Sequence, residues 1–123
     1  MQTIGRHLIL ELWGCNPGIN DVPVIERAMR ETIEAVRATL IDLRVYPFSP
    51  QGVTGVAILS ESHLMIHTWP EHGYAAIDIF TCGMHTDPEQ AIPVLRRAFA
   101  PDRVQVLQMD RGLVEENAHG VPT

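Results

Sequence analysis

The stretch VTGVAILSESHLMIHTWPEHGYAAIDIFTC, residues 53–82, decides the fold. It contains three apolar runs, at 53–59, 63–69 and 74–81, each with the length and composition of a β-strand. Only the tight connection PEHG separates the last two runs, which predicts that they are neighbouring antiparallel strands. The stretch also carries serine, histidine and glutamate side chains in the middle of the sheet, where a hydrophobic core alone does not require them.

The sequence outside this stretch predicts the remaining strands of the same sheet. Alternating patterns at 6–13, 41–48 and 103–109 indicate three further strands. Six strands and two helices predict an α+β fold, a two-layer α/β sandwich in which one largely antiparallel sheet carries both helices on one face. The other face of the sheet would have no helices over it, although many apolar side chains remain to be buried away from water. We therefore expect it to meet a second subunit in a dimer.

The first helix is expected at residues 20–40, where apolar side chains recur at helical spacing. Asn20 or Asp21 can cap its first turn by accepting a hydrogen bond from a backbone N–H. Pro23 suits the same turn, because the N–H that proline lacks has no partner there.

The second helix is expected just after Thr86, which is spaced with Glu89 as a capping box. Pro93 should kink or shorten that helix, since it removes one backbone donor. After Gly112 the residues show no periodicity, so we expect 113–123 to form a loose tail.

Composition indicates one domain spanning residues 1–123 and argues against several kinds of partner. The net charge is −6 and there is no basic cluster, which argues against nucleic acid. No apolar run is long enough to span a membrane, and the first residues lack the pattern of a signal peptide. We therefore expect a cytoplasmic protein whose cysteines, Cys15 and Cys82, are free thiols.

The expected pairing of the hairpin brings a hydroxyl and a thiol together. If Trp69 lies opposite Tyr74, then Ser62 lies opposite Thr81, and Cys82 falls beside Ser62. His67 follows Ser62 by five residues, which in a regular strand is a distance of roughly 16 Å. The odd offset also turns these two side chains to opposite faces. Either the strand breaks at Ser62, or His67 serves a second copy of the site.

Residue spacing alone leaves the function open. A serine and a histidine in one segment are most often surface or hydrogen-bonding features. His63 and His67 have the spacing of a helical metal pair, but on a strand they lie about 13 Å apart, so we expect no metal site. Cys15 is expected to be a small core residue. The chain has no Walker loop, no GxGxxG and no GxSxG elbow.

SESHLMIHTWPEHGYAAIDIFTCG, residues 60–83, resembles the signature of the prokaryotic, pyruvoyl-dependent S-adenosylmethionine decarboxylases. GRHLILELWGC at 5–15 and the order of elements extend the resemblance to about residues 4–112. The family resemblance implies a carboxy-lyase made as a zymogen. Its product would be the aminopropyl donor of spermidine and polyamine biosynthesis, and its quaternary structure a homodimer of cleaved αβ pairs.

The resemblance implies that the chain cuts itself between Glu61 and Ser62. Residues 1–61 would become the β chain and residues 62–123 the α chain. Ser62 would become a pyruvoyl group, the covalent cofactor, which forms a Schiff base with the amine of S-adenosylmethionine and accepts electrons as carbon dioxide leaves.

The resemblance also assigns roles to individual residues. His67 would take the Cα proton that drives self-cleavage, and Cys82 would return a proton to the substrate carbon. Thr54 stands where many members carry serine, whose hydroxyl steadies the cyclic intermediate of cleavage. The positions implied for substrate binding are Phe48 stacking on adenine, Glu71 on the ribose hydroxyls, and Leu59 with Glu61 along the adenine edge.

Two rival interpretations remain at this point. A pyruvoyl-dependent arginine or ornithine decarboxylase could use the same scaffold with a remodelled pocket. An uncleaved regulatory paralogue would bind without catalysing a reaction, although the retained Ser62, His67 and Cys82 argue against it. Combining the strand geometry with the resemblance, we expect one chain to contribute Ser62 and Cys82. The second chain would contribute Phe48, Thr54, His67 and Glu71.

Overall fold

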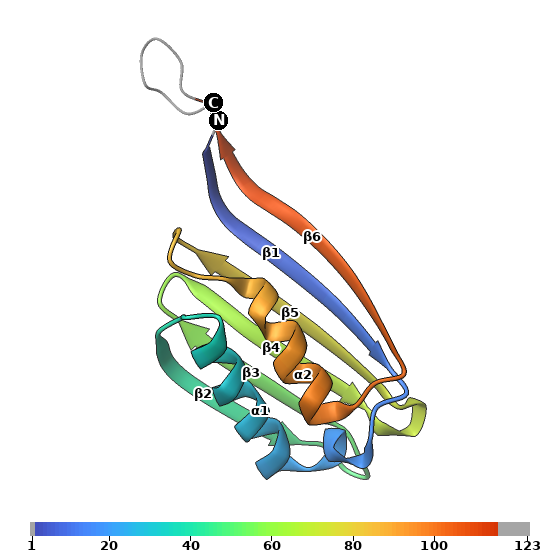
Figure 1. Cartoon of the computed structure of the whole chain (residues 1–123). Coiled ribbons are helices and arrows are strands. Elements are labelled where there is room, and N and C mark those ends of the chain that lie inside the picture. Colours follow the sequence, from blue (N-terminus) through green and yellow to red (C-terminus); the bar gives the residue numbers. More distant parts are fainter. Residues whose placement is uncertain (1, 116–123) are drawn as a thin grey trace.

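The computed structural model describes residues 2–115, apart from the side chain of Gln2. It contains one antiparallel six-stranded sheet in the order β2-β3-β4-β5-β1-β6, with both helices on the same face (Figure 1). This confirms the predicted α+β sandwich. The strands are β1 (Gln2–Trp13), β2 (Leu40–Pro47), β3 (Val53–Leu59), β4 (Ser62–Trp69), β5 (Tyr74–Cys82) and β6 (Arg103–Val114), and the helices are α1 (Val22–Ala35) and α2 (Ala91–Phe99).

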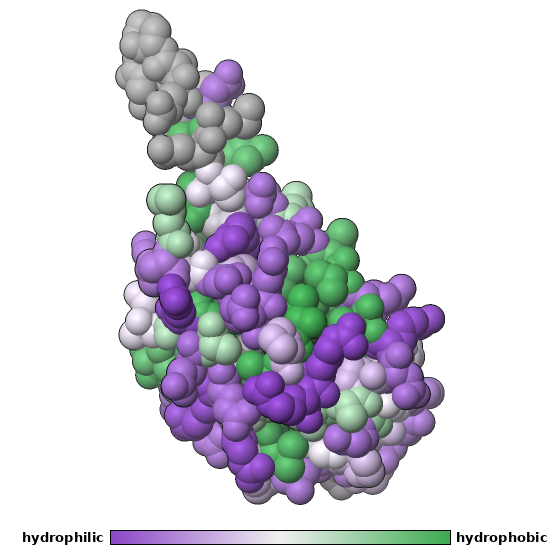
Figure 2. Space-filling model, in the orientation of Figure 1, coloured by the Kyte–Doolittle hydropathy of each residue, from purple (hydrophilic) through white to green (hydrophobic). Residues whose placement is uncertain are grey.

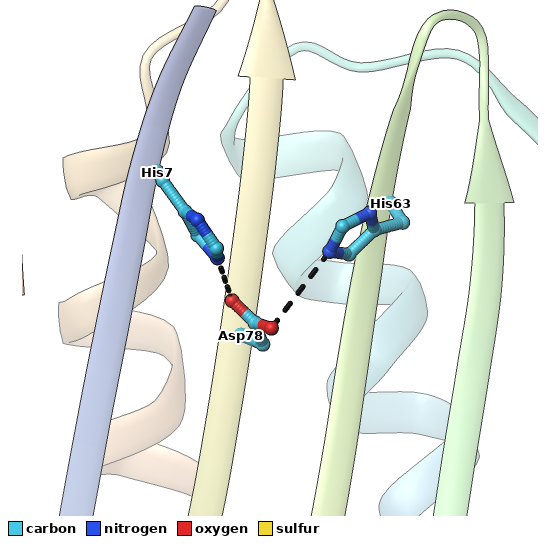
Figure 3. A group of neighbouring side chains, drawn as sticks. All are labelled: His7, His63 and Asp78. Carbon is cyan, nitrogen blue, oxygen red and sulfur yellow. Dashed lines mark hydrogen bonds and ion pairs between the residues drawn. The ribbon is translucent and has the colours of Figure 1, made fainter. Parts of the chain in front are cut away.

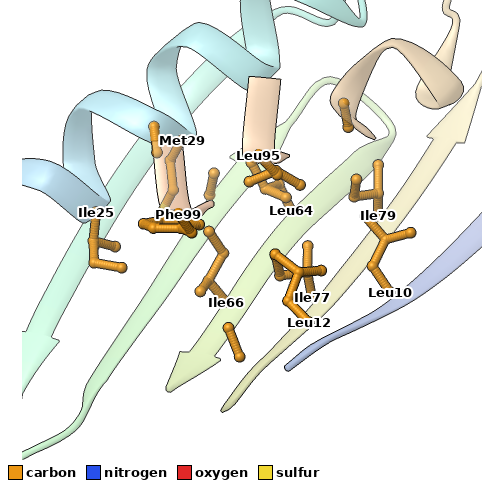
Figure 4. Packing of buried hydrophobic residues seen from close by; sticks show 14 of the residues in the cluster. Leu10, Leu12, Ile25, Met29, Leu64, Ile66, Ile77, Ile79, Leu95 and Phe99 are labelled. Carbon is orange, nitrogen blue, oxygen red and sulfur yellow. The ribbon is translucent and has the colours of Figure 1, made fainter. Parts of the chain in front are cut away.

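The core lies between the helices and one face of the sheet. Every second residue of the central strands points toward the helices and is buried, as in β5, where Ala75, Ile77 and Ile79 alternate with half-buried residues. Phe99, at the end of α2, is fully buried and packs in the layer between the helices and the sheet (Figure 4). The outer side of this helix layer is mainly hydrophilic (Figure 2).

On the opposite face of the sheet, the bare face, residues 2–115 place no helix. This face exposes large apolar side chains, among them Ile58 at 51%, Leu107 at 62% and Met109 at 58%. Exposed apolar area of this kind is typical of an interaction surface. The expectation that a second subunit covers it remains a prediction. Among residues 2–115 there is no helix long and apolar enough to cross a membrane.

The first helix is shorter than predicted. Its N-terminus is as expected, because the Asp21 carboxylate accepts a hydrogen bond from the Val24 N–H at 3.2 Å. Its C-terminus is at Ala35 rather than near residue 40. Arg37 adopts a left-handed φ of 64°, which ends the helix, and Leu40 already begins β2.

The predicted capping box of the second helix is wrong. The Thr86 hydroxyl donates instead to the carbonyls of Cys82 and Gly83, at 3.2 and 3.0 Å. The helix begins later, at Ala91, so Pro93 lies in its first turn and causes no kink. The result is a helix of nine residues, consistent with the expected shortening.

β1 and β6 are longer than the sequence pattern indicated. They pair from Trp13 with Arg103 to Gln2 with Val114, and beyond β5 they continue as a two-stranded ribbon (Figure 1). The expectation of a loose tail is therefore wrong for Leu113 and Val114, because pairing with β1 outweighs the weak local pattern. Residues 116–123 of the predicted tail lie outside the described residues.

Truncating Phe99 should destabilise the protein strongly. Phe99→Ala leaves a cavity in a close-packed core, and we expect it to lower the free energy of unfolding by about 3–5 kcal/mol. Phe48→Ala is the matched control, because Phe48 is 52% exposed, and it should cost about 1 kcal/mol or less. Urea unfolding at one fixed protein concentration measures both. Equal losses would contradict the assignment of the core.

Candidate active site

The turn between β3 and β4 is tight and strained. Leu59 pairs with Ser62, so only Ser60 and Glu61 connect the two strands. Glu61 has a φ of 58°, a left-handed conformation that costs a residue with a side chain about 1–2 kcal/mol. Such outliers are often found at functional sites, and here the next peptide bond joins Glu61 to Ser62.

The hydroxyl of Ser62 and the thiol of Cys82 lie next to this peptide bond. Trp69 pairs with Tyr74, as expected, and the register brings the end of β5 beside the start of β4. The Cys82 N–H donates to Ser62 Oγ at 3.2 Å, and its Sγ–H donates to the Glu61 carbonyl oxygen at 3.0 Å. A nucleophile therefore stands next to a carbonyl whose oxygen already accepts a hydrogen bond, an arrangement suited to acyl transfer.

A pocket lies at the other end of the hairpin. Its volume is about 320 Å³ and its lining includes Phe48, Thr54, His67, Trp69 and Glu71. Thr54 pairs with His67 across β3 and β4, and Thr54 Oγ1 lies 3.2 Å from His67 Nδ1. The pocket combines an aromatic surface, a carboxylate and a hydrogen-bonded imidazole, which suits a ligand with a flat ring and hydroxyl groups.

β4 separates Ser62 from the residues of the pocket. The strand is regular from Ser62 to Trp69, with Leu64 and Ile66 buried on the helix-facing side. Ser62 shares that side, whereas His67 lies on the bare side, roughly 16 Å along the strand. The chain turns before Ser62 and not between Ser62 and His67, so one chain holds the candidate site as two separate halves.

Leu59 and Glu61 occupy different environments, although both were expected along the edge of the ligand. The Leu59 side chain is 2% exposed and belongs to the core. A contact between Leu59 and a ligand would therefore fall to its backbone. Glu61 is exposed in the turn.

Aromatic residues beside the pocket were missed by the sequence reasoning. Tyr74 stacks on Trp13 and on Trp69, with ring centroids 4.3 and 5.3 Å apart. The Tyr74 hydroxyl donates to Glu11 at 2.6 Å. Burial, followed by the hydrogen bond and charge of Glu11, raises the pKa of Tyr74 to about 12. The signal was available, because strand alternation places these aromatic residues on one face.

One group within residues 2–115 has the spacing of a metal site. The ligand atoms of His7, His63 and Asp78 lie within 4.8 Å of one another on three adjacent strands (Figure 3). His7 Nε2 contacts Asp78 Oδ1, and Arg111 donates to His7 Nδ1 at 3.0 Å. That bond leaves the ring proton of neutral His7 on Nε2, the nitrogen that a metal would need free. The arrangement is therefore a hydrogen-bonded chain.

The two cysteines differ in their surroundings. Cys15 packs against the core and its N–H donates to the Gly73 carbonyl at 2.9 Å. Burial, and secondly the charge of Asp102, raises the pKa of the Cys15 thiol to about 11. Cys82 lies half-buried at the end of β5, where its sulfur faces the β3–β4 turn.

Iodoacetamide at pH 8 should therefore modify Cys82 much faster than Cys15. The thiolate is the reacting form, and a thiol titrating near 11 is on the order of 0.1% thiolate at that pH. Peptide mass spectrometry of Ser62→Ala protein after short labelling times gives both rates. Equal labelling of the two cysteines would contradict the difference in environment.

Comparison with known proteins finds the same family along nearly the whole chain. Residues 6–112 match the family described as S-adenosylmethionine decarboxylase. An S-adenosylmethionine decarboxylase proenzyme of Thermomicrobium roseum is 57% identical over 115 residues, covering 93% of this chain and 98% of the relative. A proenzyme of the same name from Methanococcus maripaludis is 51% identical over 116 residues, covering 94% and 95%.

A solved structure has the same fold. The crystal structure of the adenosylmethionine decarboxylase from Aquifex aeolicus superposes with a TM-score of 0.86 at 34% identity. The match covers 96% of this chain and 98% of that chain.

Proposed function

This chain belongs to the S-adenosylmethionine decarboxylase family, and on that premise we propose that it is a self-cleaving precursor whose pyruvoyl form decarboxylates S-adenosylmethionine. The single observation that carries the proposal is the arrangement at Glu61–Ser62. The hydroxyl of Ser62 adjoins the preceding carbonyl, and the Cys82 thiol donates to that carbonyl oxygen at 3.0 Å. The enzyme is accordingly a carboxy-lyase, and we expect it in the cytoplasm.

Self-cleavage follows from this geometry. Ser62 Oγ attacks the Glu61 carbonyl carbon, an ester C–O bond forms and the peptide C–N bond breaks. Negative charge develops on the Glu61 oxygen, where the Cys82 thiol already donates a hydrogen bond. Loss of the Ser62 Cα proton then releases Glu61 as a carboxylate. Addition of water and loss of ammonia leave a pyruvoyl group at position 62.

Local structure favours cleavage at this bond. Cutting after Glu61 frees that residue from the left-handed conformation that the two-residue turn imposes. The cut leaves the hydrogen-bonded pairs of β3 and β4 in place, so the cleaved chains remain joined by the sheet. Residue 62 becomes the first residue of β4, held by the core residues that follow it.

Decarboxylation uses the residues around the same position. The pyruvoyl group supplies an electron sink for the electrons left when carbon dioxide departs. Cys82 stands beside residue 62 and gives its proton to the substrate carbon.

The pocket at the far end of the hairpin favours an adenosyl substrate. Phe48 offers an aromatic surface for adenine, and Glu71 offers a carboxylate for the ribose hydroxyls. Arginine and ornithine need neither contact. The names of the relatives favour the same substrate over both alternatives.

A complete site requires two chains. Within one chain the residues of the pocket lie roughly 16 Å from Ser62, on the other face of β4. A second copy packed on the bare face would bring its own Phe48, Thr54, His67 and Glu71 to Cys82 and to the Glu61–Ser62 turn at the end of that face. His67 of one chain would then take the Cα proton of Ser62 in the other, while Thr54 holds the His67 ring. The functional unit would be a homodimer of cleaved αβ pairs.

Purified active protein should consist of two chains of roughly half the precursor mass. Intact-mass spectrometry should find the α chain beginning with a pyruvoyl group at position 62. Ser62→Ala should abolish cleavage, because no hydroxyl remains to attack. Ser60→Ala is the matched control in the same turn and should still cleave. An active preparation that contains only full-length chain refutes self-cleavage.

Complementation tests the shared site. Ser62→Ala co-expressed with His67→Ala can form a mixed dimer in which one site has an intact serine and an intact histidine. That site should cleave and decarboxylate S-adenosylmethionine, at up to half the activity of the unaltered dimer. Two differently tagged Ser62→Ala chains give the negative control. If isolated mixed dimers are as inactive as either parent, the site lies within one chain.

A further inference from the structure

Each decarboxylation consumes one proton, which this chain must replace. When the carbon–carbon bond to the carboxylate breaks, the electron pair stays on the substrate carbon. A C–H bond then forms there with the proton of the Cys82 thiol. Cys82 is left as a thiolate and must regain a proton before the next turnover. This requirement rests on the proposed function, in which Cys82 is the donor.

His63, on β4, lies on the same face of the sheet as Cys82, on the neighbouring strand β5. His63 pairs directly with Phe80, and their rings stack with centroids 5.9 Å apart. Cys82 follows Phe80 by two residues on β5, so it is the diagonal neighbour of His63, at about 7–8 Å. The relay requires water to bridge the gap between the ring and the sulfur.

The ring of His63 is held from its other side. His63 Nε2 lies 3.9 Å from Asp78 Oδ2 and is buried, yet has no hydrogen-bond partner among residues 2–115. Asp78 in turn contacts His7, which accepts a hydrogen bond from Arg111. Figure 3 shows both imidazoles converging on the one carboxylate. An imidazole between a carboxylate and a thiol is the arrangement that relays protons in enzymes with catalytic cysteines.

We propose that His63 returns a proton to Cys82 after each turnover. His63 gives up a ring proton to the thiolate, and the S–H bond forms again. The neutral ring then takes a proton from solvent, while Asp78 stabilises the charged ring and fixes its orientation. The net reaction is a carboxylate plus one proton giving carbon dioxide and a C–H bond. His63 acts through Cys82 and does not itself touch the substrate.

Other charged groups share this face and contribute to the field at His63. They come from β1, β4, β5, β6 and the edge strand β2, and they are His7, Glu11, His67, Asp78, Arg103, Arg111, Asp42 and Arg44.

His63→Ala in the complete enzyme tests the proposal, with the exposed His72→Ala as control. The altered chain should still cleave, but kcat should fall by about 100-fold with KM unchanged. Imidazole added to the buffer should restore part of the rate of His63→Ala and leave His72→Ala unaffected. The α chain should also accumulate alanine at position 62 through misplaced protonation, as intact mass shows. A wild-type chain that fails to cleave contradicts the proposed function instead.

A second measurement keeps the proposal testable if His63→Ala impairs cleavage. In uncleaved Ser62→Ala protein at pH 7, the added His63→Ala change should slow alkylation of Cys82 several-fold, because the base proposed to take the thiol proton is removed. Cys15, with its pKa near 11, stays unreactive and serves as internal reference. Unchanged turnover together with unchanged alkylation overturns the proposal.

Discussion

The two-residue period of β4 is the constraint on which the rest of the structure depends. In a regular strand each residue faces away from its neighbours, so Ser62 falls on the helix side and His67 on the bare side. Leu64 and Ile66 fix that register, because a slip of one residue would expose them and bury histidines. The same packing that stabilises the core therefore keeps the Ser62 side chain apart from the pocket.

If Ser62 and the pocket act in one reaction, their separation within one chain favours assembly of two chains. The bare face carries exposed apolar side chains together with one half of the site, including His67 and the pocket around Phe48. The reactive turn at Glu61–Ser62 lies at one end of this face. A second copy covering the face would both remove apolar surface from water and complete the site. Stability and catalysis would then depend on the same contact.

Much of the fold follows from local pattern. The three central strands, the Asp21 cap and the pairing of Trp69 with Tyr74 were all predictable from alternation and turn residues. The ends of elements were not, because they depend on tertiary partners. Thr86 bonds to the Cys82–Gly83 carbonyls instead of capping a helix, and Leu113 is ordered by its pairing with Thr3.

The same distinction holds for the candidate site. Register alone placed Cys82 beside Ser62, while the roles of Phe48 and Glu71 came from family resemblance. The group of His7, His63 and Asp78 could not be found from spacing, because its members come from strands far apart in sequence. Nor does local sequence show the left-handed Glu61, since a glutamate carries no preference for that conformation.

The shared site is tested most directly by a short cross-link between Cys82 and the pocket. The question is whether the cross-link joins two chains or two positions of one chain. A cysteine introduced at Phe48, in Ser62→Ala protein that also carries Cys15→Ala, provides the second thiol for a short bifunctional reagent. Within one chain the two positions lie at opposite ends of the hairpin, while in the proposed dimer they would face the same site. We expect the cross-linked protein to migrate as a dimer on a denaturing gel. A cross-link formed within single chains, shown by peptide mapping of the monomer band, would contradict the shared site.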